Sequence, residues 1–325
     1  MARRRWHSLP IRTGGGNEEM LKVTSVTPDL GSLRIAIVNV YFYGHPSAGD
    51  RGWVLIDAGL PGSAGLIARA AAGRYGAGAR PAAIVLTHGH FDHVGALRTL
   101  AERWDVPVFA HRLELPYLTG ESPYAPPDPW VGGGAMALLS PLYPRGPYDV
   151  RGRMSPLPDD GSVPGMPAWR WIHTPGHSPG HVSFFRESDR TLVVGDAFVT
   201  VKQESAWAAA TWRPEIHGPP AYFTHDWASA RRSVEILAGL DPEVAATGHG
   251  PPLRGPGMRD DLAGLSRRFG EVAVPSSGRY VSRPALYGPH GIVSVPPPGR
   301  PPAKQAAVGL ALVALAGAML LRGRR

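Results

Sequence analysis

A run rich in histidine and aspartate directly follows a short apolar stretch, and this combination limits the folds that the chain can adopt. Residues 82–87 read AAIVLT, which is typical of a buried β-strand, and the next six residues read HGHFDH. His88, His90, Asp92 and His93 therefore lie at the end of a buried strand, and all four carry groups that bind metals. A histidine-rich loop that binds nothing is the alternative, but this spacing at a strand end indicates a metal site.

Three further candidate ligands follow strand-like segments later in the chain. His177 lies within TPGHSPGH at 174–181, Asp196 follows LVVG, and His249 follows VAATG. Each of these is weak alone, because a single histidine is more often a hydrogen-bonded structural residue. All three follow strands, so we expect them to converge on the sheet edge that carries the histidine-rich run.

The cysteine count narrows the choice of metal. The chain has 0 cysteines, so there is no disulfide framework and no thiolate ligand. Imidazole and carboxylate ligands suit zinc, iron or manganese. We predict two divalent ions, with Zn²⁺ favoured over iron or manganese.

Between the two ends of the chain, strand-like and helix-like segments alternate. Strands outnumber helices, which indicates sheet layers covered by helices. The predicted helices are 64–75, 94–104 and 227–240, and the predicted strands are 33–43, 52–57, 82–87, 106–110, 169–173, 181–186, 191–195 and 244–247.

Composition also suggests how the chain is divided. A catalytic domain is predicted over 20–255, with a proline- and glycine-rich insertion at 112–165 that is a candidate lid. A basic, flexible tail is predicted over 1–19, and an extension with a proline-rich linker over 256–305.

The segment 306–321 is uncharged and rich in alanine, leucine, valine and glycine. As a helix it would span roughly 24 Å, somewhat less than the ~30 Å hydrocarbon core. A helix packed on the domain is the alternative, but the preceding linker and the lack of a polar face favour a transmembrane anchor. The N-terminus has no apolar signal region, so the catalytic domain is expected in the cytoplasm, although the arginines after the segment favour the opposite orientation.

The net charge of +8 raises the question of a nucleic-acid partner. Nine of the 34 basic residues lie in 1–12 and 300–325, where there are no acids, so the intervening chain has 25 basic and 26 acidic residues, or −1. A nearly neutral body is not a surface that tracks phosphates. We expect a small-molecule acyl substrate and no nucleic acid.

These motifs resemble those of the metallo-β-lactamase superfamily over roughly residues 20–255. The resemblance implies a four-layer αββα sandwich with the site at one edge of two facing sheets. The matching motifs are IDAG at 56–59, HGHFDH at 88–93, TPGHSPGH at 174–181, GDA at 195–197 and TGHG at 247–250.

The resemblance also implies roles for single residues. His88, His90 and His177 correspond to ligands of the first metal, Asp92, His93 and His249 to ligands of the second, and Asp196 to the bridging carboxylate. Asp92 would also hold the nucleophile and accept its proton. Asp57, His173 and His181 are candidates for contacts that orient the ligands, while ordinary structural roles remain open for both histidines.

Departures from the family pattern narrow the choice among the branches of the superfamily. True β-lactamases of the superfamily generally lack the bridging aspartate, and some use a cysteine, so Asp196 favours the glyoxalase II, lactonase and general hydrolase branches. TPGHSPGH is very similar to quorum-signal lactonases, but their pocket tyrosine is not matched in Ala197–Val199. The glutathione-binding basic cluster of glyoxalase II is not evident either. The segments GDAFVTVKQES and IHGPPAYFT resemble a group of uncharacterised bacterial hydrolases.

The resulting hypothesis is hydrolysis of an ester, thioester, lactone or related acyl bond by a hydroxide held between two metal ions. Three rival functions stay open. A phosphodiesterase or nuclease of the same fold would share all seven ligands. The second rival is a persulfide dioxygenase-like iron enzyme, and the third is a non-catalytic metal sensor.

Aromatic residues are frequent in two segments near these motifs. They could form a lid over an apolar substrate, but packing of the loops is the simpler interpretation. They are Tyr117, Tyr124, Trp130, Tyr143 and Tyr148 in the insertion, and Trp207, Trp212, Tyr222 and Phe223 after Asp196.

Overall fold

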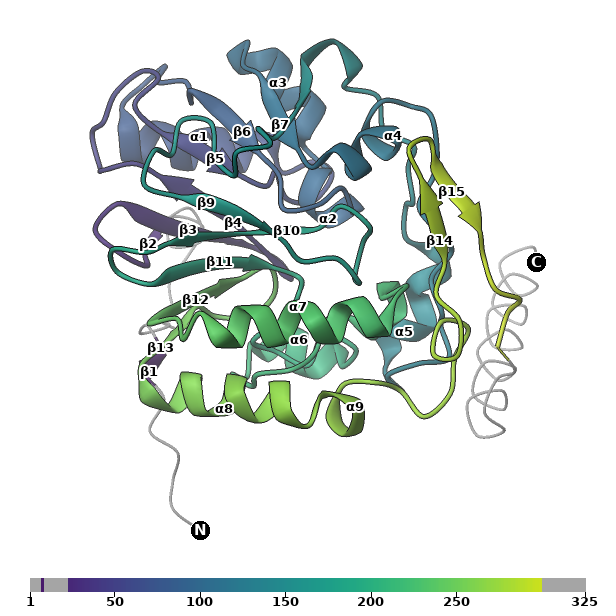
Figure 1. Ribbon diagram of the computed structural model, residues 1–325. Coiled ribbons are helices and arrows are strands. Elements are labelled where there is room, and N and C mark those ends of the chain that lie inside the picture. Colours follow the sequence, from purple (N-terminus) through teal and green to yellow (C-terminus); the bar gives the residue numbers. More distant parts are fainter. Residues whose placement is uncertain (1–6, 9–22, 300–325) are drawn as a thin grey trace, which may run out of the picture.

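Two β-sheets face each other, and helices cover the outer face of each sheet (Figure 1). The computed structural model describes residues 7–8 and 23–299 of the 325-residue chain. This arrangement is the mixed α/β sandwich that the alternation of strands and helices predicted.

The first sheet has seven strands in the order β2-β3-β4-β5-β6-β7-β8. Strands β2 to β5 are antiparallel to their neighbours, and β5 to β8 run parallel. The carboxyl ends of β5 and β6 therefore meet at one edge. The strands are β2 Thr24–Ser25, β3 Leu30–Ile35, β4 Val38–Tyr43, β5 Val54–Ile56, β6 Ala83–Val85, β7 Val108–Ala110 and β8 Met154–Pro156.

The second sheet has six strands in the order β1-β13-β12-β11-β10-β9. Only β11 and β12 are parallel to each other within it. The residues that follow these two strands therefore leave the sheet side by side. The strands are β1 His7–Ser8, β9 Arg170–His173, β10 Val182–Arg186, β11 Thr191–Gly195, β12 Val244–Thr247 and β13 Leu253–Arg254.

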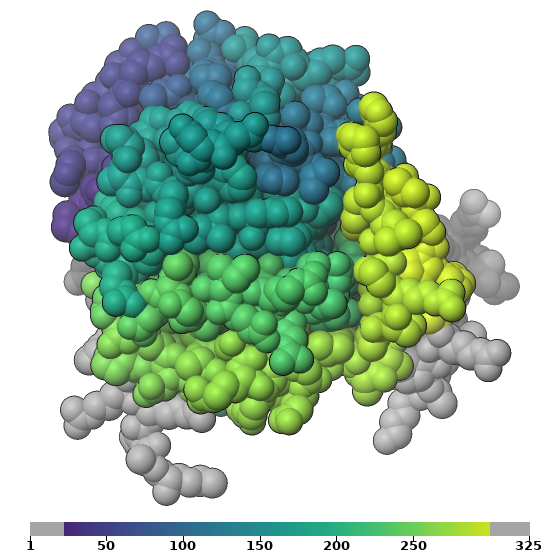
Figure 2. Space-filling model, in the orientation of Figure 1, coloured from purple at the N-terminus to yellow at the C-terminus, as the bar shows by residue number. Residues whose placement is uncertain are grey.

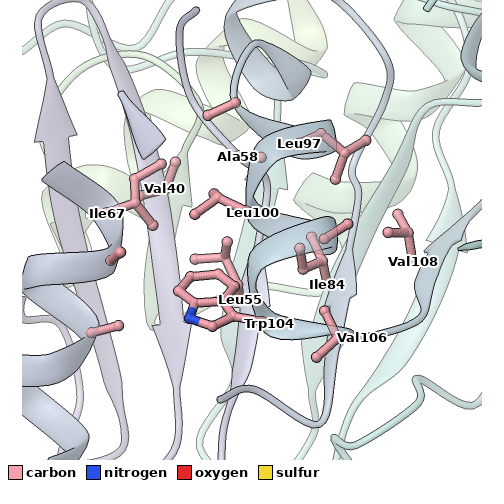
Figure 3. Packing of buried hydrophobic residues seen from close by; sticks show 14 of the residues in the cluster. Val40, Leu55, Ala58, Ile67, Ile84, Leu97, Leu100, Trp104, Val106 and Val108 are labelled. Atoms are coloured by element: carbon pink, nitrogen blue, oxygen red, sulfur yellow. The ribbon is translucent and has the colours of Figure 1, made fainter. Parts of the chain in front are cut away.

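Three buried apolar clusters lie between the four layers, one at each boundary between neighbouring layers. Helices α1 (Ala64–Tyr75) and α3 (Leu97–Trp104) pack on the first sheet, where Ile67 and Leu100 belong to the cluster that includes Leu55 and Ile84 (Figure 3). Helices α7 (Trp227–Gly239) and α8 (Pro256–Arg267) pack on the second sheet. A third cluster lies between the sheets and includes Val85 and Val193. Each fully buried aliphatic side chain contributes about 1.5–3 kcal/mol.

One predicted strand is two strands in the structure. The chain turns between β3 and β4 at Ala36, which has a φ of 52°, so the segment predicted as a strand over 33–43 is part of a hairpin. The apolar pattern continues through this turn without glycine or proline, which is why the sequence showed no break.

The insertion at 112–165 contains more regular structure than its composition suggests. It holds α4 (Leu115–Leu118), α5 (Ala135–Leu139) and strand β8, which extends the first sheet. Short helical elements complete the chain: α2 Phe91–Val94, η2 Arg112–Glu114, η3 Ser140–Leu142, η4 Arg151–Arg153, α6 Ala206–Thr211, η5 Ala221–Phe223 and α9 Phe269–Val272.

The described part of the chain ends in a hairpin, β14 (Leu286–Gly288) and β15 (Gly291–Ser294). It forms the yellow ridge on the face shown in Figure 2, and it contacts the insertion where the Ile292 amide donates to Ser122 Oγ at 3.4 Å. Residues after 255 thus take part in the packing of the second sheet and of the insertion. The predicted domain limits stay predictions.

The membrane anchor predicted over 306–321 lies outside the described residues. Within residues 7–8 and 23–299, no helix is long and apolar enough to cross a bilayer. The longest helix there, α7, has 13 residues, or roughly 20 Å at about 1.5 Å per residue, against the ~30 Å needed. The predicted transmembrane helix and the membrane location that it implied are therefore corrected and withdrawn.

Candidate metal centre

Seven histidine and aspartate side chains meet at one edge of the sandwich, and all of them are buried. The edge is the one where β5, β6, β11 and β12 have their carboxyl ends, joined by the turn between β9 and β10. The structure thus brings together every candidate ligand: His88, His90, Asp92, His93, His177, Asp196 and His249.

His88, His90 and His177, called here the first triad, form a purely imidazole group. Each offers one ring nitrogen, and the three nitrogens lie within 4.8 Å of one another. His90 Nδ1 and His177 Nε2 face each other at 2.9 Å. His88 Nδ1 lies 3.1 Å from Thr87 Oγ1, which leaves His88 Nε2 without a hydrogen-bond partner in the described chain.

Asp92, His93 and His249, called here the second triad, combine a carboxylate with two anchored imidazoles. His93 Nδ1 donates to Asp57 Oδ2 at 2.8 Å, and His249 Nδ1 donates to the carbonyl of Ile37 at 2.7 Å. These bonds direct the Nε2 atoms inward, where His249 Nε2 lies 3.4 Å from Asp92 Oδ2. Such contacts fix the tautomer and the orientation of a ligating histidine.

Asp196 lies between the two triads. Its Oδ2 is 3.0 Å from His249 Nε2 and 3.5 Å from His177 Nε2, while its Oδ1 is 3.6 Å from His93 Nε2. One carboxylate therefore reaches nitrogens of both triads, which is the placement required of a group that joins two ions.

The two triads differ in their electrostatics. Burial lowers the pKa of His88, His90 and His177 well below the ordinary range, so these imidazoles are neutral at neutral pH. Burial acts to lower the pKa of His93 as well, but the carboxylates of Asp196 and Asp57 raise it well above that range.

The carboxylates of the site are also shifted. Burial raises the pKa of Asp92. Burial acts in the same direction on Asp196, but His249 and His93 hold the pKa of that carboxyl well below its usual range. In the chain alone, Asp196 is thus the anion that the imidazoles of the second triad stabilise.

The residues present fit a divalent transition metal. Three inward atoms, His88 Nε2, His93 Nε2 and Asp196 Oδ1, are buried without a hydrogen-bond partner in the described chain. Burying such atoms unpaired is costly, at about 1–3 kcal/mol each. Nitrogen and carboxylate donors without sulfur are a set that binds Zn²⁺ and other divalent ions.

Two of the three predicted orienting residues contact the site. Asp57 accepts from the amide and the hydroxyl of Thr87, both at 2.8 Å, besides holding His93. His181 Nε2 accepts from the Asp196 amide at 2.8 Å, and its Nδ1 lies 2.8 Å from Thr174 Oγ1.

His173 has different neighbours. Its Nε2 donates to the carbonyl of Pro179 at 2.9 Å, and its ring stacks on His111 with centroids 4.3 Å apart. In the described chain none of these contacts involves a candidate ligand. An orienting role for His173 stays a prediction without a contact that favours it.

Aromatic side chains surround the first triad. Phe223 stacks on His90 at 4.7 Å between centroids, and Tyr124 packs edge-on against the same ring at 4.6 Å. Tyr143 is half-buried 5.3 Å from Phe91, whereas Trp207 is 77% exposed. Most of the predicted aromatic residues thus pack, and the lid stays a prediction.

Glu114 is the residue near the site that sequence reasoning missed. It is fully buried and contacts both loops that carry the first triad. The signal was faint, because an acid between leucines in HRLELPYL is typical of any short amphipathic helix.

Comparison with known proteins agrees with this geometry. The family model described as the metallo-beta-lactamase superfamily matches residues 34–249. The chain is 47% identical over 262 residues to the probable metallo-hydrolase YflN of Bacillus subtilis, covering 81% of this chain and 96% of that protein. It is 33% identical over 173 residues to the probable metallo-hydrolase YybB of the same organism, covering 53% of this chain and 66% of that protein.

A solved structure shows the same fold. The beta-lactamase domain protein from Burkholderia ambifaria has a TM-score of 0.52 and 21% identity, covering 76% of each chain. At that identity the similarity supports the architecture alone.

Proposed function

The chain belongs to the metallo-β-lactamase superfamily, and from this membership we propose that it is a metal-dependent hydrolase of ester, thioester, lactone or related acyl bonds. Two divalent ions would be held by the two triads and by Asp196, with Zn²⁺ favoured by the donor set. The similarity to relatives named as probable metallo-hydrolases supports a hydrolytic reaction.

The position of Asp196 is the observation that carries the proposal. Its Oδ2 lies within 3.5 Å of one imidazole nitrogen from each triad. A carboxylate in that place is suited to join two ions. It favours a bridged dinuclear hydrolase over a site with one ion.

Bound ions would lower the pKa of a water to near neutrality and would polarise the carbonyl that it attacks. The chain itself supplies the group that handles the proton. Asp92 is buried, and its Oδ2 lies 3.4 Å from His249 Nε2 at the edge of the second triad. A carboxylate in this place can accept a hydrogen bond from the attacking water, so we assign Asp92 to hold that water and take its proton.

The surroundings favour a small acyl substrate. Phe91 and Tyr143 are half-buried and pack against Phe223, which stacks on the His90 ring of the first triad, so this side of the site is apolar. The body of the chain, with 25 basic and 26 acidic residues, carries no excess positive charge for a polyanion. A small molecule with an apolar acyl portion is therefore the proposed substrate class.

Asp92→Asn tests this role. Zn²⁺-loaded protein is assayed on an ester, a thioester, a lactone, a β-lactam and a phosphodiester dye. We expect turnover of at least one of the first three, and a loss of more than about 100-fold on that substrate in Asp92→Asn. An equally active variant would overturn the role of Asp92.

Other outcomes overturn the reaction class. Hydrolysis of the phosphodiester alone would indicate a phosphodiesterase. Bound iron with oxygen consumption would indicate an oxidative enzyme, and bound metal without turnover on the whole panel would indicate a sensor.

A further inference from the structure

A buried carboxylate, that of Glu114, joins the two loops that carry the first triad. Glu114 lies at the end of η2 (Arg112–Glu114), directly before α4, and is 0% exposed. It is outside the metal-binding motifs, and within the described chain its hydrogen bonds go to no candidate ligand side chain. Its partners are the loops themselves.

Each carboxylate oxygen of Glu114 accepts two hydrogen bonds. Oε1 accepts from the Gly180 amide at 2.7 Å and from Ser178 Oγ at 2.8 Å. Oε2 accepts from the Gly89 amide at 2.9 Å and from the Tyr124 hydroxyl. Gly89 separates two ligands of the histidine-rich run, and Ser178 follows the third ligand of the triad directly. Four donors from three segments therefore meet on one carboxylate.

The first triad needs such a backbone anchor more than the second. His93 and His249 are oriented through Nδ1 by Asp57 and by the Ile37 carbonyl. By contrast, His90 Nε2 and His177 Nδ1, the ring nitrogens outside their mutual contact, have no hydrogen-bond partner among residues 7–8 and 23–299. Apart from the packing of Phe223 and Tyr124 on His90, these two rings therefore depend on their loops for their position.

The packing around Glu114 is tight. A Cβ added at Gly180 would lie 2.8 Å from both the Cγ and the backbone nitrogen of Glu114. The loop can approach this closely only because residue 180 has no side chain. No lysine, arginine or histidine forms an ion pair with Glu114 within the described part of the chain, so hydrogen-bond donors alone stabilise its carboxylate.

We propose that Glu114 is a positioning residue of the metal centre, which clamps the His90 and His177 loops together and thereby sets the affinity of the first triad for its metal. This inference rests on the proposed dinuclear site. Glu114 acts through the loops, as outer contacts of a metal ligand do, and the loss of such contacts typically lowers metal affinity about 10- to 100-fold.

The test is Glu114→Gln. Glutamine has nearly the same shape, but its amide nitrogen is a donor and would face an amide N–H or a hydroxyl. Zn²⁺ binding to the chelator-treated chain is followed by competition with a chelator of known affinity, which resolves two binding constants. We expect the constant of the first triad to fall about 10- to 100-fold and that of the second to change by less than about 3-fold.

Asp128→Asn is the matched control. Asp128 is also buried, 3% exposed, and its carboxylate also accepts two backbone amides, from Trp130 at 3.1 Å and Arg279 at 2.5 Å. It ties the insertion to the segment after α9 rather than to a ligand loop. Its substitution should leave both binding constants unchanged, whatever it does to the melting temperature.

Ser178→Ala keeps the proposal testable if Glu114→Gln does not fold. It removes one donor to Glu114 and should weaken the first constant on the order of 5-fold. Equal weakening of both constants, or no change in either, would overturn the role of Glu114. A wild-type chain that binds no metal would instead contradict the proposed function itself, so the two failures are distinguishable.

Discussion

The ligand side chains of the two triads are held in position by different kinds of contact. In the second triad, side chains are held by side-chain and carbonyl acceptors, Asp57 for His93 and Ile37 for His249. In the first triad, His90 and His177 have no such acceptor within the described residues. Their loops are instead joined by the Glu114 carboxylate, which accepts from the backbone amides of Gly89 and Gly180. His93 and His249 are thus oriented by hydrogen bonds to their rings, and His90 and His177 depend mainly on the position of their loops.

The difference follows from where the ligands stand in the fold. His249 follows β12 closely, within a sheet edge that is fixed by neighbouring strands. His177 stands in the turn between the antiparallel strands β9 and β10, farther from any strand end. A ligand in a turn needs a tertiary contact to define its position, and Glu114 provides one at Gly180.

The largest expected effect comes from removing one ligand of each triad. His177→Ala and His249→Ala should each lower turnover by more than about 100-fold, beyond the range for outer contacts. Each variant should also lose one metal ion, from its own triad. Metal analysis per chain beside the activity assay checks this.

The comparison fails if either single substitution empties both triads. Such a result would mean that the ions bind as one unit, and that the separate anchoring of the triads has no consequence for metal affinity.

A smaller effect is expected from Asp57→Asn. This change removes the charged acceptor of His93 Nδ1, while the loops clamped by Glu114 remain. Metal affinity of the second triad should fall about 10- to 100-fold, and that of the first should fall less, because Asp57 reaches His88 only through Thr87. The same chelator competition measures it. If only the first triad lost metal affinity, Asp57 would not be the residue that orients the second triad.

The smallest effect concerns the opposite edge of the sandwich, where Arg186 forms an ion pair with Asp29 at 2.5 Å and joins the two sheets. Arg186 ends β10 opposite Thr191, the first residue of β11, whereas the site follows the last residue of β11. Asp29→Asn should cost on the order of 1–3 kcal/mol, because the pair is largely buried and Asp189 still binds Arg186, and it should leave metal content unchanged.

The pH dependence of this contact has a definite sign. Burial acts to raise the pKa of Asp29, but the hydrogen bond and charge of Arg186 lower it below the ordinary 3.8. Its stabilising effect is therefore present above 3.8 and is lost as the pH falls through the lower folded-state value. Thermal unfolding of chelator-treated protein should show less acid sensitivity in Asp29→Asn. If the melting temperatures of the wild type and of Asp29→Asn fell equally as the pH is lowered, this ion pair would not contribute to the acid sensitivity of the fold.

The convergence of the ligands could be predicted because strand ends are visible in sequence. Asp196 and His249 follow two strands that are parallel neighbours, and the carboxyl ends of parallel strands meet at one edge. Their role as ligands stays a prediction. The orienting contact of Asp57 had a landmark in the IDAG segment, but its geometry with His93 required the structure.

Several features could not be predicted, because they depend on contacts between distant segments. Glu114 meets Gly89 and Ser178 across 25 and 64 positions, and nothing near it in sequence marks it as part of a site. The turn at Ala36 was hidden by an apolar pattern that continues through it. The apolar composition of 306–321 led to a membrane anchor that we have withdrawn.

The number of metal ions per chain decides whether Asp196 joins a dinuclear centre. Native mass spectrometry of the Zn²⁺-loaded protein should show two ions bound to the wild-type chain. Asp196→Ala should show one ion or none and should lose turnover, because Asp196 reaches both triads. An active wild-type chain with a single ion, or an Asp196→Ala chain with two ions and unchanged turnover, would contradict a dinuclear centre joined by Asp196.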